Sequence, residues 1–212
     1  MTIRVILCDD HALIRRGIRD TLSDAPDIEV VGEAGDYSEL RSLLRTASCD
    51  VLVLDINMPG RSGLDVLHVL KDEGSTMKVL VVSMYPEEQY AIRALRAGAF
   101  GYVNKGGDPA LLVTAVRTVS QGRKYVTPEI AQMLVESLTT PVQENAHEKL
   151  SDRELQTLVM IASGKRLSDI ADELTLSPKT VSVYRARVLE KLGLSNNSEM
   201  TVYAIRHGLV GE

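Results

Sequence analysis

The sequence has no tryptophan, one phenylalanine and two cysteines in 212 residues, and no long apolar run. A membrane-spanning helix needs about 20 consecutive apolar residues, so none is predicted. The first residues lead directly into a strand pattern, where a signal peptide would carry an apolar segment. Cys8 and Cys49 lie at the edges of apolar segments without a partner motif, which favours buried, reduced thiols over a disulfide or a metal site. A cytoplasmic protein without membrane contact is expected.

The composition that remains is typical of a globular protein, with 44% hydrophobic and 25% charged residues. Charge is distributed unevenly. Residues 1–149 contain 16 Lys and Arg against 21 Asp and Glu, whereas residues 150–212 contain 8 of each kind. Residues 178–192 have a local excess of three positive charges on one predicted helix. Because binding is decided within a Debye length of about 8–10 Å, this basic helix outweighs the acidic total and indicates nucleic acid as a partner.

Short β-branched runs alternate with helical patterns through the first half of the chain. Strands are predicted at 3–8, 28–34, 51–55, 78–83 and 101–104. Helices are predicted at 12–24, 37–47, 63–74, 87–98 and 108–122. Five successive strand and helix units predict an α/β fold: a doubly wound, five-stranded parallel sheet of the flavodoxin-like type, with helices on both faces.

The second half has no strand signal. One more helix is predicted at 127–138, and the polar, proline-containing residues 139–149 then form a linker. Four helices follow, at 152–163, 167–174, 178–192 and 198–208, and indicate a small all-α domain. The predicted organisation is therefore a first domain at 1–122, a linker with one helix at 123–149, and a second domain at 150–212.

Polar residues stand where the predicted strands end. The first strand is followed by Asp9 and Asp10, the third ends at Asp55, the fourth at Ser83 and the fifth at Asn104 and Lys105. In an open parallel sheet, functional residues lie at the carboxyl ends of the strands. The carboxylates converge there if the first and third strands are neighbours. Like charges so close together need neutralising, and Mg²⁺ suits a few carboxylates with phosphate oxygens. These residues predict a magnesium site built for a phosphoryl group.

A carboxylate can itself accept the phosphoryl group, and Asp55 is the predicted acceptor. The metal and Lys105 are expected to stabilise the equatorial oxygens of the group in transfer, and Ser83 to donate a hydrogen bond to one of them. Residues 51–57, "VLVLDIN", also resemble the motif of haloacid-dehalogenase-type phosphatases. Those enzymes need a second Asp as acid and base, whereas this chain has Asn57, so the enzyme interpretation is disfavoured.

Residues 1–122 resemble the receiver domain of bacterial two-component response regulators. The resemblance lies in Asp9, Asp10, Asp55, Pro59, Gly63, Ser83, Tyr102 and Lys105. Residues 150–209 resemble the LuxR-type helix-turn-helix through "LSDREL", "IADELTLSPKTVSVYRARVLEKLGL" and "YAIRHGL". The combination is similar to the NarL/FixJ class of transcription regulators. Gly106 departs from the family pattern, which frequently has a proline after the lysine.

The resemblance implies phosphorylation of Asp55 by a sensor histidine kinase and no turnover enzyme activity. It implies that Asp10 and Asp55 bind Mg²⁺ directly, Asp9 through water, and Asn57 through its backbone carbonyl. Ser83 is implied to move towards the phosphoryl group and Tyr102 to rotate inward behind it. This is a two-state switch, with residues 84–106 as the surface that changes shape.

A helix-turn-helix is predicted over 167–192, with Ser151 or Asp152 capping the preceding helix and Ser177 capping the second. On 178–192, helical spacing buries Val181, Val188, Leu189 and Leu192. Lys179, Thr180, Arg187 and Lys191 are predicted for phosphates, and Ser182, Val183 and Ala186 for the approach of base edges. Tyr184 lies at the boundary of this surface.

Ser182, Val183 and Ala186 are not residue types that form two hydrogen bonds to one base, as Arg does to guanine, so two paired domains are needed for tight binding. In the resembling family the last helix, here 198–208, pairs the domains. Val202 and Ile205 are expected to be exposed on it, and phosphorylation is expected to control dimerisation. Two hypotheses stay open beside this one: the disfavoured phosphatase, and a phosphorylation-independent DNA-binding protein whose first domain is a dimerisation scaffold. The four histidines show no ligand spacing and are interpreted as surface or capping residues.

Overall fold

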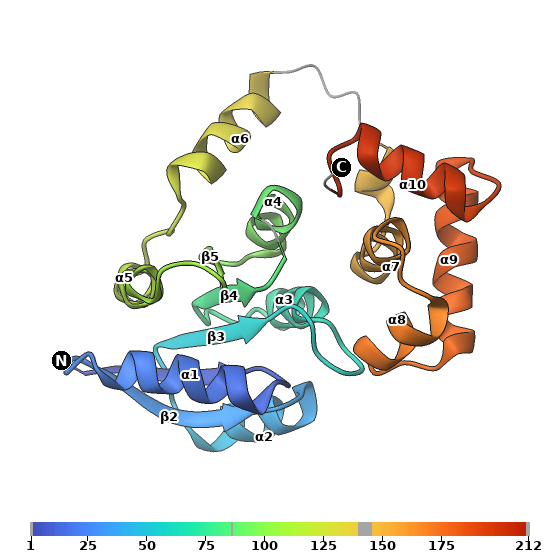
Figure 1. Cartoon of the computed structure of the whole chain (residues 1–212). Coiled ribbons are helices and arrows are strands. Elements are labelled where there is room, and N and C mark those ends of the chain that lie inside the picture. The colour runs from blue at the N-terminus through green and yellow to red at the C-terminus, as the bar shows by residue number, and fades with distance from the viewer. Residues whose placement is uncertain (1, 86, 140–145, 211–212) are drawn as a thin grey trace. The chain divides into compact units, whose positions relative to one another are not determined.

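The computed structural model of the protein describes residues 2–85, 87–139 and 146–210. The chain divides into two compact units, at 1–139 and 140–212 (Figure 1). The helix predicted inside the linker, α6 (Pro128–Thr139), belongs to the first unit and contacts its helix α4 (Glu87–Ala97). Residues 140–145 of the predicted linker lie outside the described residues. The domain bounds drawn from the sequence stay a prediction.

The first unit is built on a five-stranded sheet in which every pairing is parallel. Its strands are β1 (Ile3–Cys8), β2 (Ile28–Ala34), β3 (Val51–Asp55), β4 (Val79–Ser83) and β5 (Gly101–Asn104). The order across the sheet is β2-β1-β3-β4-β5, so the first and third strands are neighbours. This order is the condition under which the strand-end carboxylates converge, and the predicted doubly wound fold is confirmed.

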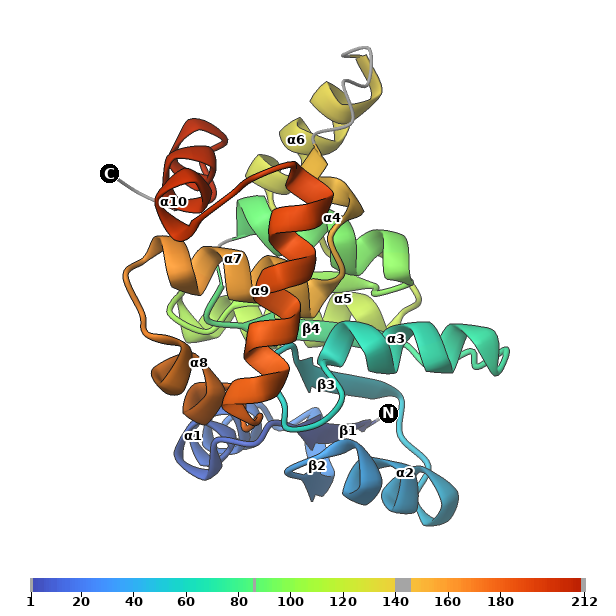
Figure 2. The same cartoon turned by 90° about the vertical axis from the view of Figure 1, so that its right-hand side faces the viewer.

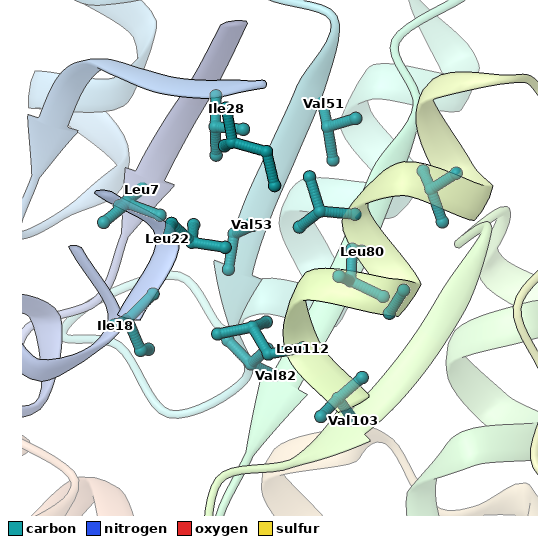
Figure 3. Close-up of a cluster of buried hydrophobic side chains, with 14 of the residues drawn as sticks. Leu7, Ile18, Leu22, Ile28, Val51, Val53, Leu80, Val82, Val103 and Leu112 are labelled. Atoms are coloured by element: carbon teal, nitrogen blue, oxygen red, sulfur yellow. The ribbon is translucent and has the colours of Figure 1, made fainter. Parts of the chain in front are cut away.

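Two layers of helices cover the sheet (Figure 1). The remaining helices of this unit are α1 (Ala12–Ser23), α2 (Tyr37–Thr46), α3 (Gly63–Asp72) and α5 (Pro109–Ser120). The apolar faces of α1 and α5 pack on one side, where Leu22 and Leu112 meet strand residues such as Val53 and Val82 (Figure 3). The alternate strand residues point to the other layer and are equally buried, because side chains alternate along a strand. The central strands β3 and β4 are buried at every position.

The predicted elements are all present, and their bounds differ by at most two residues, for local reasons. Four predicted helices ended on Gly74, Gly98, Gly122 or Gly208, but these glycines have φ of 69°, 113°, 77° and 65° and lie beyond the helix ends. Asp108 does not begin α5 but caps it, because its side chain accepts a hydrogen bond from the N–H of Ala110. Lys78 lies outside β4 and donates its Nζ to the carbonyl of Ser120 at 2.6 Å.

The second unit is helical throughout its described residues. A short 3₁₀ helix η1 (Ala146–Lys149) precedes α7 (Asp152–Ala162), α8 (Leu167–Glu173), α9 (Pro178–Leu192) and α10 (Asn197–Arg206). Helix α7 contacts α8, α9 and α10, so it forms the centre of the unit. Figure 2 shows the length of α9, with α8 next to its N-terminal end. The turn between them contains Thr175 at a φ of 53°, which is uncommon for a β-branched residue.

Within the described parts of the chain, no helix combines the length and the apolar character needed to cross a membrane. The two cysteines are free thiols, with Cys8 buried and Cys49 partly buried. Burial raises the pKa of Cys8 to about 12, so this thiol stays protonated.

Candidate functional site

The buried strand β3 ends on Asp55, next to the polar residues that follow its neighbouring strand β1. Cys8 of β1 pairs with Leu54 of β3, so the next residues, Asp9 and Asp55, emerge side by side. Both side chains are only 2% exposed. Ligand atoms of Asp9, Asp10, His11 and Asp55 all lie within 4.8 Å of one another. The convergence predicted for the three aspartates is therefore observed.

Lys105 supplies the positive charge at the centre of this group. Its Nζ lies 2.7 Å from Oδ2 of Asp55 and 2.7 Å from Oδ2 of Asp9, and its side chain is 4% exposed. The residue follows β5 directly, and its backbone N–H donates to the carbonyl of Ser83 at 2.8 Å. The sheet therefore fixes the backbone of Lys105, and the side chain reaches back over the strand ends.

One ammonium group does not neutralise the pocket. Burial raises the pKa of Asp55, the charge of Lys105 lowers it and the charge of Asp9 raises it, so that the resulting pKa is about 6. The side-chain oxygen Oδ1 of Asn57 is also buried, and no hydrogen-bond partner for it lies among the described residues. Carboxylate and amide oxygens are the ligands of hard divalent cations. The residues present therefore fit a metal ion, which can bind at this acidic cluster.

Ser83 and Tyr102 lie beside this pocket and meet at one backbone segment. Tyr102 is fully buried, and its hydroxyl donates to the carbonyl of Tyr85 at 2.7 Å. The hydroxyl of Ser83 accepts a hydrogen bond from the N–H of Tyr85 at 3.2 Å. Burial raises the pKa of Tyr102 well above its ordinary value, so its hydroxyl remains a donor. Tyr102 is buried in this structure, and its rotation behind Ser83 on phosphorylation stays a prediction.

The geometry also includes residues that the sequence did not single out. The N–H of His11 donates to Asp9 at 2.8 Å, and its Nδ1 lies 2.7 Å from Oδ1 of Asp10. Arg15 donates to the backbone carbonyl of Asp9. Only the position of His11 directly after the aspartates could have indicated this contact. Its side chain is 51% exposed, so it lies at the rim of the pocket.

Helix α9 has the two faces predicted for it. Val181 and Val188 are completely buried, and Leu189 and Leu192 are partly buried. The five residues expected to point outward are all exposed: Lys179, Ser182, Val183, Ala186 and Arg187. Val183 is 44% exposed, so an apolar side chain stands free in the middle of this surface. The helix begins as predicted, with Ser177 as cap and Pro178 at its first position.

Some predicted contact residues of α9 already have partners in the protein. Nζ of Lys191 lies 2.7 Å from Oε2 of Glu154, whose side chain is 2% exposed. Glu154 completes the predicted capping box of α7 with Ser151 as the N-cap residue. The hydroxyl of Thr180 is bonded to that of Ser177 at 2.8 Å. Tyr184 is partly buried, in agreement with its predicted place at the boundary.

The last helix exposes the apolar residues expected on it. Val202 is 47% exposed and Ile205 is 41% exposed. Arg185 of α9 donates its Nε to the side-chain oxygen of Asn197, in the first turn of α10, at 2.6 Å. At the opposite end, the hydroxyl of Tyr203 meets the His147 ring at Nδ1 at 3.0 Å. Helix α10 is thus held at both ends while its apolar residues remain exposed.

Comparisons with known proteins agree with both parts of this description. Residues 5–117 match the family described as the response regulator receiver domain, and residues 148–204 match the luxR family of bacterial regulatory proteins. Response regulator UvrY of Escherichia coli strain K12 is 39% identical over 98% of this chain and 95% of its own length. Response regulator GacA of Pseudomonas viridiflava is 40% identical over 98% of both chains.

Solved structures show the same arrangement of elements. RcsB of Salmonella enterica serovar Typhimurium, bound to promoter rprA with the phosphomimetic BeF₃⁻, is 27% identical with a TM-score of 0.64, over 96% of this chain and 98% of that one. The response regulator ChrA of a heme-sensing two-component system is 32% identical with a TM-score of 0.52, over 99% of both chains. The protein therefore belongs to the NarL/FixJ class of two-component response regulators, which join a receiver domain to a LuxR-type DNA-binding domain and regulate transcription.

Proposed function

We propose that this chain is a cytoplasmic response regulator that a sensor histidine kinase phosphorylates on Asp55, and that phosphorylation switches dimerisation and sequence-specific DNA binding. The observation that carries the proposal is the buried Asp55 carboxylate, which lies 2.7 Å from Lys105 and among the other acidic residues of the pocket. A buried carboxylate with a cation on one side and further acids on the other suits a transferred phosphoryl group.

The chemistry follows from the positions of these residues. A carboxylate oxygen of Asp55 attacks the phosphorus of a phosphohistidine, the P–N bond breaks, and the imidazole nitrogen keeps the electron pair. Lys105 is already within bonding distance of Asp55 and neutralises charge on the transferred group. Ser83 donates its hydroxyl to one phosphoryl oxygen. The chain assists its own phosphorylation and dephosphorylation but turns over no separate substrate.

Mg²⁺ is the proposed cofactor. Asp9, Asp10, Asp55 and the backbone carbonyl of Asn57 are the residues that would hold it. When bound, the ion supplies positive charge for the phosphoryl oxygens and for the carboxylates. The raised pKa of Asp55 supports this assignment, because it describes buried carboxylates with too little positive charge around them.

The proposed output is the pairing of two DNA-binding units. Solved structures describe RcsB bound to a promoter in the presence of BeF₃⁻ and as dimers bound to DNA, and the same behaviour is proposed for this chain. Lys179, Thr180, Arg187 and Lys191 are proposed for phosphates, and Ser182, Val183, Tyr184 and Ala186 for base edges. Val202 and Ile205 on α10 are proposed to contact the second copy, because both are exposed and apolar.

The experiment compares the protein with Asp55→Asn and with Asp72→Asn, an exposed aspartate of α3 that serves as control. Intact mass after acetyl phosphate and Mg²⁺ should show one added phosphoryl group in the protein and in the control, and none in Asp55→Asn. Light scattering with Mg²⁺ and beryllofluoride should show doubling of the mass in the same two proteins. Phosphoryl uptake that persists in Asp55→Asn contradicts Asp55 as the acceptor. Equal dimers in all three favour a receiver that serves only as a dimerisation scaffold.

A further inference from the structure

The side chain of Asn104 connects two loops at the carboxyl end of the sheet. Its amide nitrogen Nδ2 donates to the carbonyl oxygen of Tyr85 at 3.2 Å. Its oxygen Oδ1 accepts a hydrogen bond from the N–H of Gly106 at 2.7 Å. Tyr85 belongs to the loop between β4 and α4, and Gly106 to the loop between β5 and α5. One amide group therefore holds both loops.

Each of these loops contributes to the phosphoryl site. Lys105 stands between Asn104 and Gly106, and its ammonium group contacts Asp9 and Asp55. The turn that follows it is closed twice by Asn104, because the backbone carbonyl of Asn104 also accepts from the N–H of Gly107 at 3.1 Å. The direction of the Lys105 backbone therefore depends on Asn104 as well as on the sheet.

The other loop contacts the proposed switch residues, Ser83 at the end of β4 and Tyr102 in β5. The Tyr85 carbonyl that accepts from Asn104 also accepts from the hydroxyl of Tyr102 at 2.7 Å. The N–H of Tyr85 in turn donates to Ser83. Tyr102 therefore shares the Tyr85 carbonyl with Asn104, and Ser83 bonds to the N–H of the same residue. A link of this kind needs a residue with an N–H at position 106, which glycine has and proline lacks.

We propose that Asn104 is a positioning residue that ties the Lys105 loop to the Tyr85 loop, so that the lysine and the switch residues adopt their positions together. The inference rests on the proposed function of Asp55, since the lysine positioned is the one that contacts this carboxylate. The side chain of Asn104 has two arms, the donor Nδ2 and the acceptor Oδ1, and their hydrogen bonds go to Tyr85 and Gly106 rather than to Asp55 or Lys105. Its two arms make separate contributions, and each can be removed separately.

Three variants separate the two arms from general weakening of the loop. Asn104→Ala removes both arms. Asn104→Ser removes the donor to Tyr85 but leaves a short hydroxyl that can accept from the N–H two residues on, as in a serine turn. Asp108→Ala is the matched control, because it removes the cap of α5 in the same loop and leaves both arms of Asn104 intact.

Amide hydrogen exchange and the carbonyl resonance of Tyr85, both measured without metal or phosphate donor, test the link itself. The N–H of Gly106 loses its acceptor in Asn104→Ala, and loss of one hydrogen bond is expected to speed its exchange about 2- to 10-fold. The carbonyl of Tyr85 loses a donor in Asn104→Ala and in Asn104→Ser, so its ¹³C resonance should move upfield in both variants and stay unchanged in Asp108→Ala. An unchanged Tyr85 carbonyl resonance in Asn104→Ala overturns the proposal, and so does an equal shift in the Asp108→Ala control.

The rate of Asp55 phosphorylation by acetyl phosphate tests the positioning role. Asn104→Ala should slow it about 2- to 10-fold, as expected for a lost hydrogen bond, and Asn104→Ser should recover most of the loss. The rate in Asp108→Ala should stay unchanged. A rate unchanged in Asn104→Ala, or equally low in Asn104→Ser, contradicts positioning through Gly106. If the unmodified protein takes up no phosphoryl group, the proposed function fails. The measurements at the Gly106 N–H and the Tyr85 carbonyl still decide whether Asn104 links the loops.

Discussion

Lys105 and Asp55 form a buried ion pair, with Nζ and Oδ2 at 2.7 Å and both side chains at most 4% exposed. The same ammonium group pairs with Asp9, so one cation serves two buried carboxylates. Removal of one partner of a buried pair leaves an uncompensated charge in a medium that solvates it poorly. We therefore expect the pair to contribute to stability as well as to the proposed phosphoryl transfer.

Lys105→Met should lower the free energy of unfolding by about 3 kcal/mol at pH 7 in the absence of metal, because two carboxylates lose their cation. Urea unfolding monitored by circular dichroism measures this directly. Mg²⁺ should restore part of the loss, since the ion supplies positive charge to the same carboxylates. Lys71→Met changes an exposed lysine of α3 and should leave stability within about 0.5 kcal/mol. Equal stability of the two variants contradicts the role of the pair.

Asp55→Asn should stabilise the metal-free protein at neutral pH. Burial raises the pKa of Asp55 from 3.8 to about 6, so the unfolded chain loses this proton at lower pH than the folded chain does. The contribution of Asp55 to the free energy of unfolding therefore falls as pH rises from about 4 to about 6. Above that range it stays at its lower value. A shift of this size corresponds to about 2–3 kcal/mol.

The test is to unfold the unmodified protein and Asp55→Asn in the presence of a chelator at several pH values between about 3.5 and about 8. This range spans the pKa of Asp55 in the unfolded and in the folded chain. The stabilisation by Asn should be largest above pH 6 and should disappear near pH 4. A stability difference independent of pH would mean that Asp55 has an ordinary pKa in the folded protein. With Mg²⁺ the unmodified protein should become more stable than Asp55→Asn, because the ion favours the charged carboxylate.

Local sequence patterns were sufficient to predict the elements of this fold. Period-two and helical spacing locate every described strand and α-helix to within two residues, because burial on fixed faces imposes those periods, whereas the 3₁₀ helix η1 falls in the predicted linker. The convergence of Asp9 and Asp55 needed one further assumption, the adjacency of β1 and β3, which the observed order confirms. The outward face of α9 followed from the same reasoning, with Val181 and Val188 buried as expected.

Contacts between distant side chains could not be predicted in this way. Spacing indicates that Lys191 lies on a basic helix, but its bond to Glu154 depends on how α7 packs against α9. Asn104 is recognisable in sequence only as the end of a strand, since its partner Tyr85 lies in another loop. Both contacts arise from tertiary packing, which no period in the sequence encodes.

Gly63→Ala should be destabilising and should displace Asp55, the proposed acceptor. A Cβ at this position would lie 2.1 Å from the backbone oxygen of Asp55, so the start of α3 and the end of β3 would have to separate. Overpacking of this kind costs about 1–3 kcal/mol, measured by urea unfolding. Gly17→Ala is the control. Gly17 is exposed in α1, and beyond its chain neighbours and the backbone of its own helix no atom lies within 4 Å of an added Cβ, so the change should stabilise by about 0.5–1 kcal/mol. If Gly63→Ala is as stable as the unmodified protein, the close approach is not required.

Arg187 and Lys191 lie one turn apart on α9, yet their substitution should have different effects. Arg187 is exposed, whereas Lys191 is bound to Glu154 at 2.7 Å. Burial raises the pKa of Glu154, but the bonds from Lys191 and Ser151 outweigh it, and the pKa lies below its usual value. Lys191→Ala should therefore cost about 1–3 kcal/mol of unfolding free energy, because it leaves a buried carboxylate without its cation. Arg187→Ala should leave stability within about 0.5 kcal/mol.

DNA binding should reverse this order. Arg187→Ala should lower the slope of log affinity against log salt concentration by about 1, as expected when one phosphate contact is lost. Lys191→Ala should change the slope less, because its ammonium group is partly neutralised by Glu154. Fluorescence anisotropy with a labelled duplex at several salt concentrations measures both slopes, with no need to know the operator. If Lys191→Ala lowers the slope as much as Arg187→Ala and unfolds at the same urea concentration as the unmodified protein, Lys191 leaves Glu154 to contact DNA.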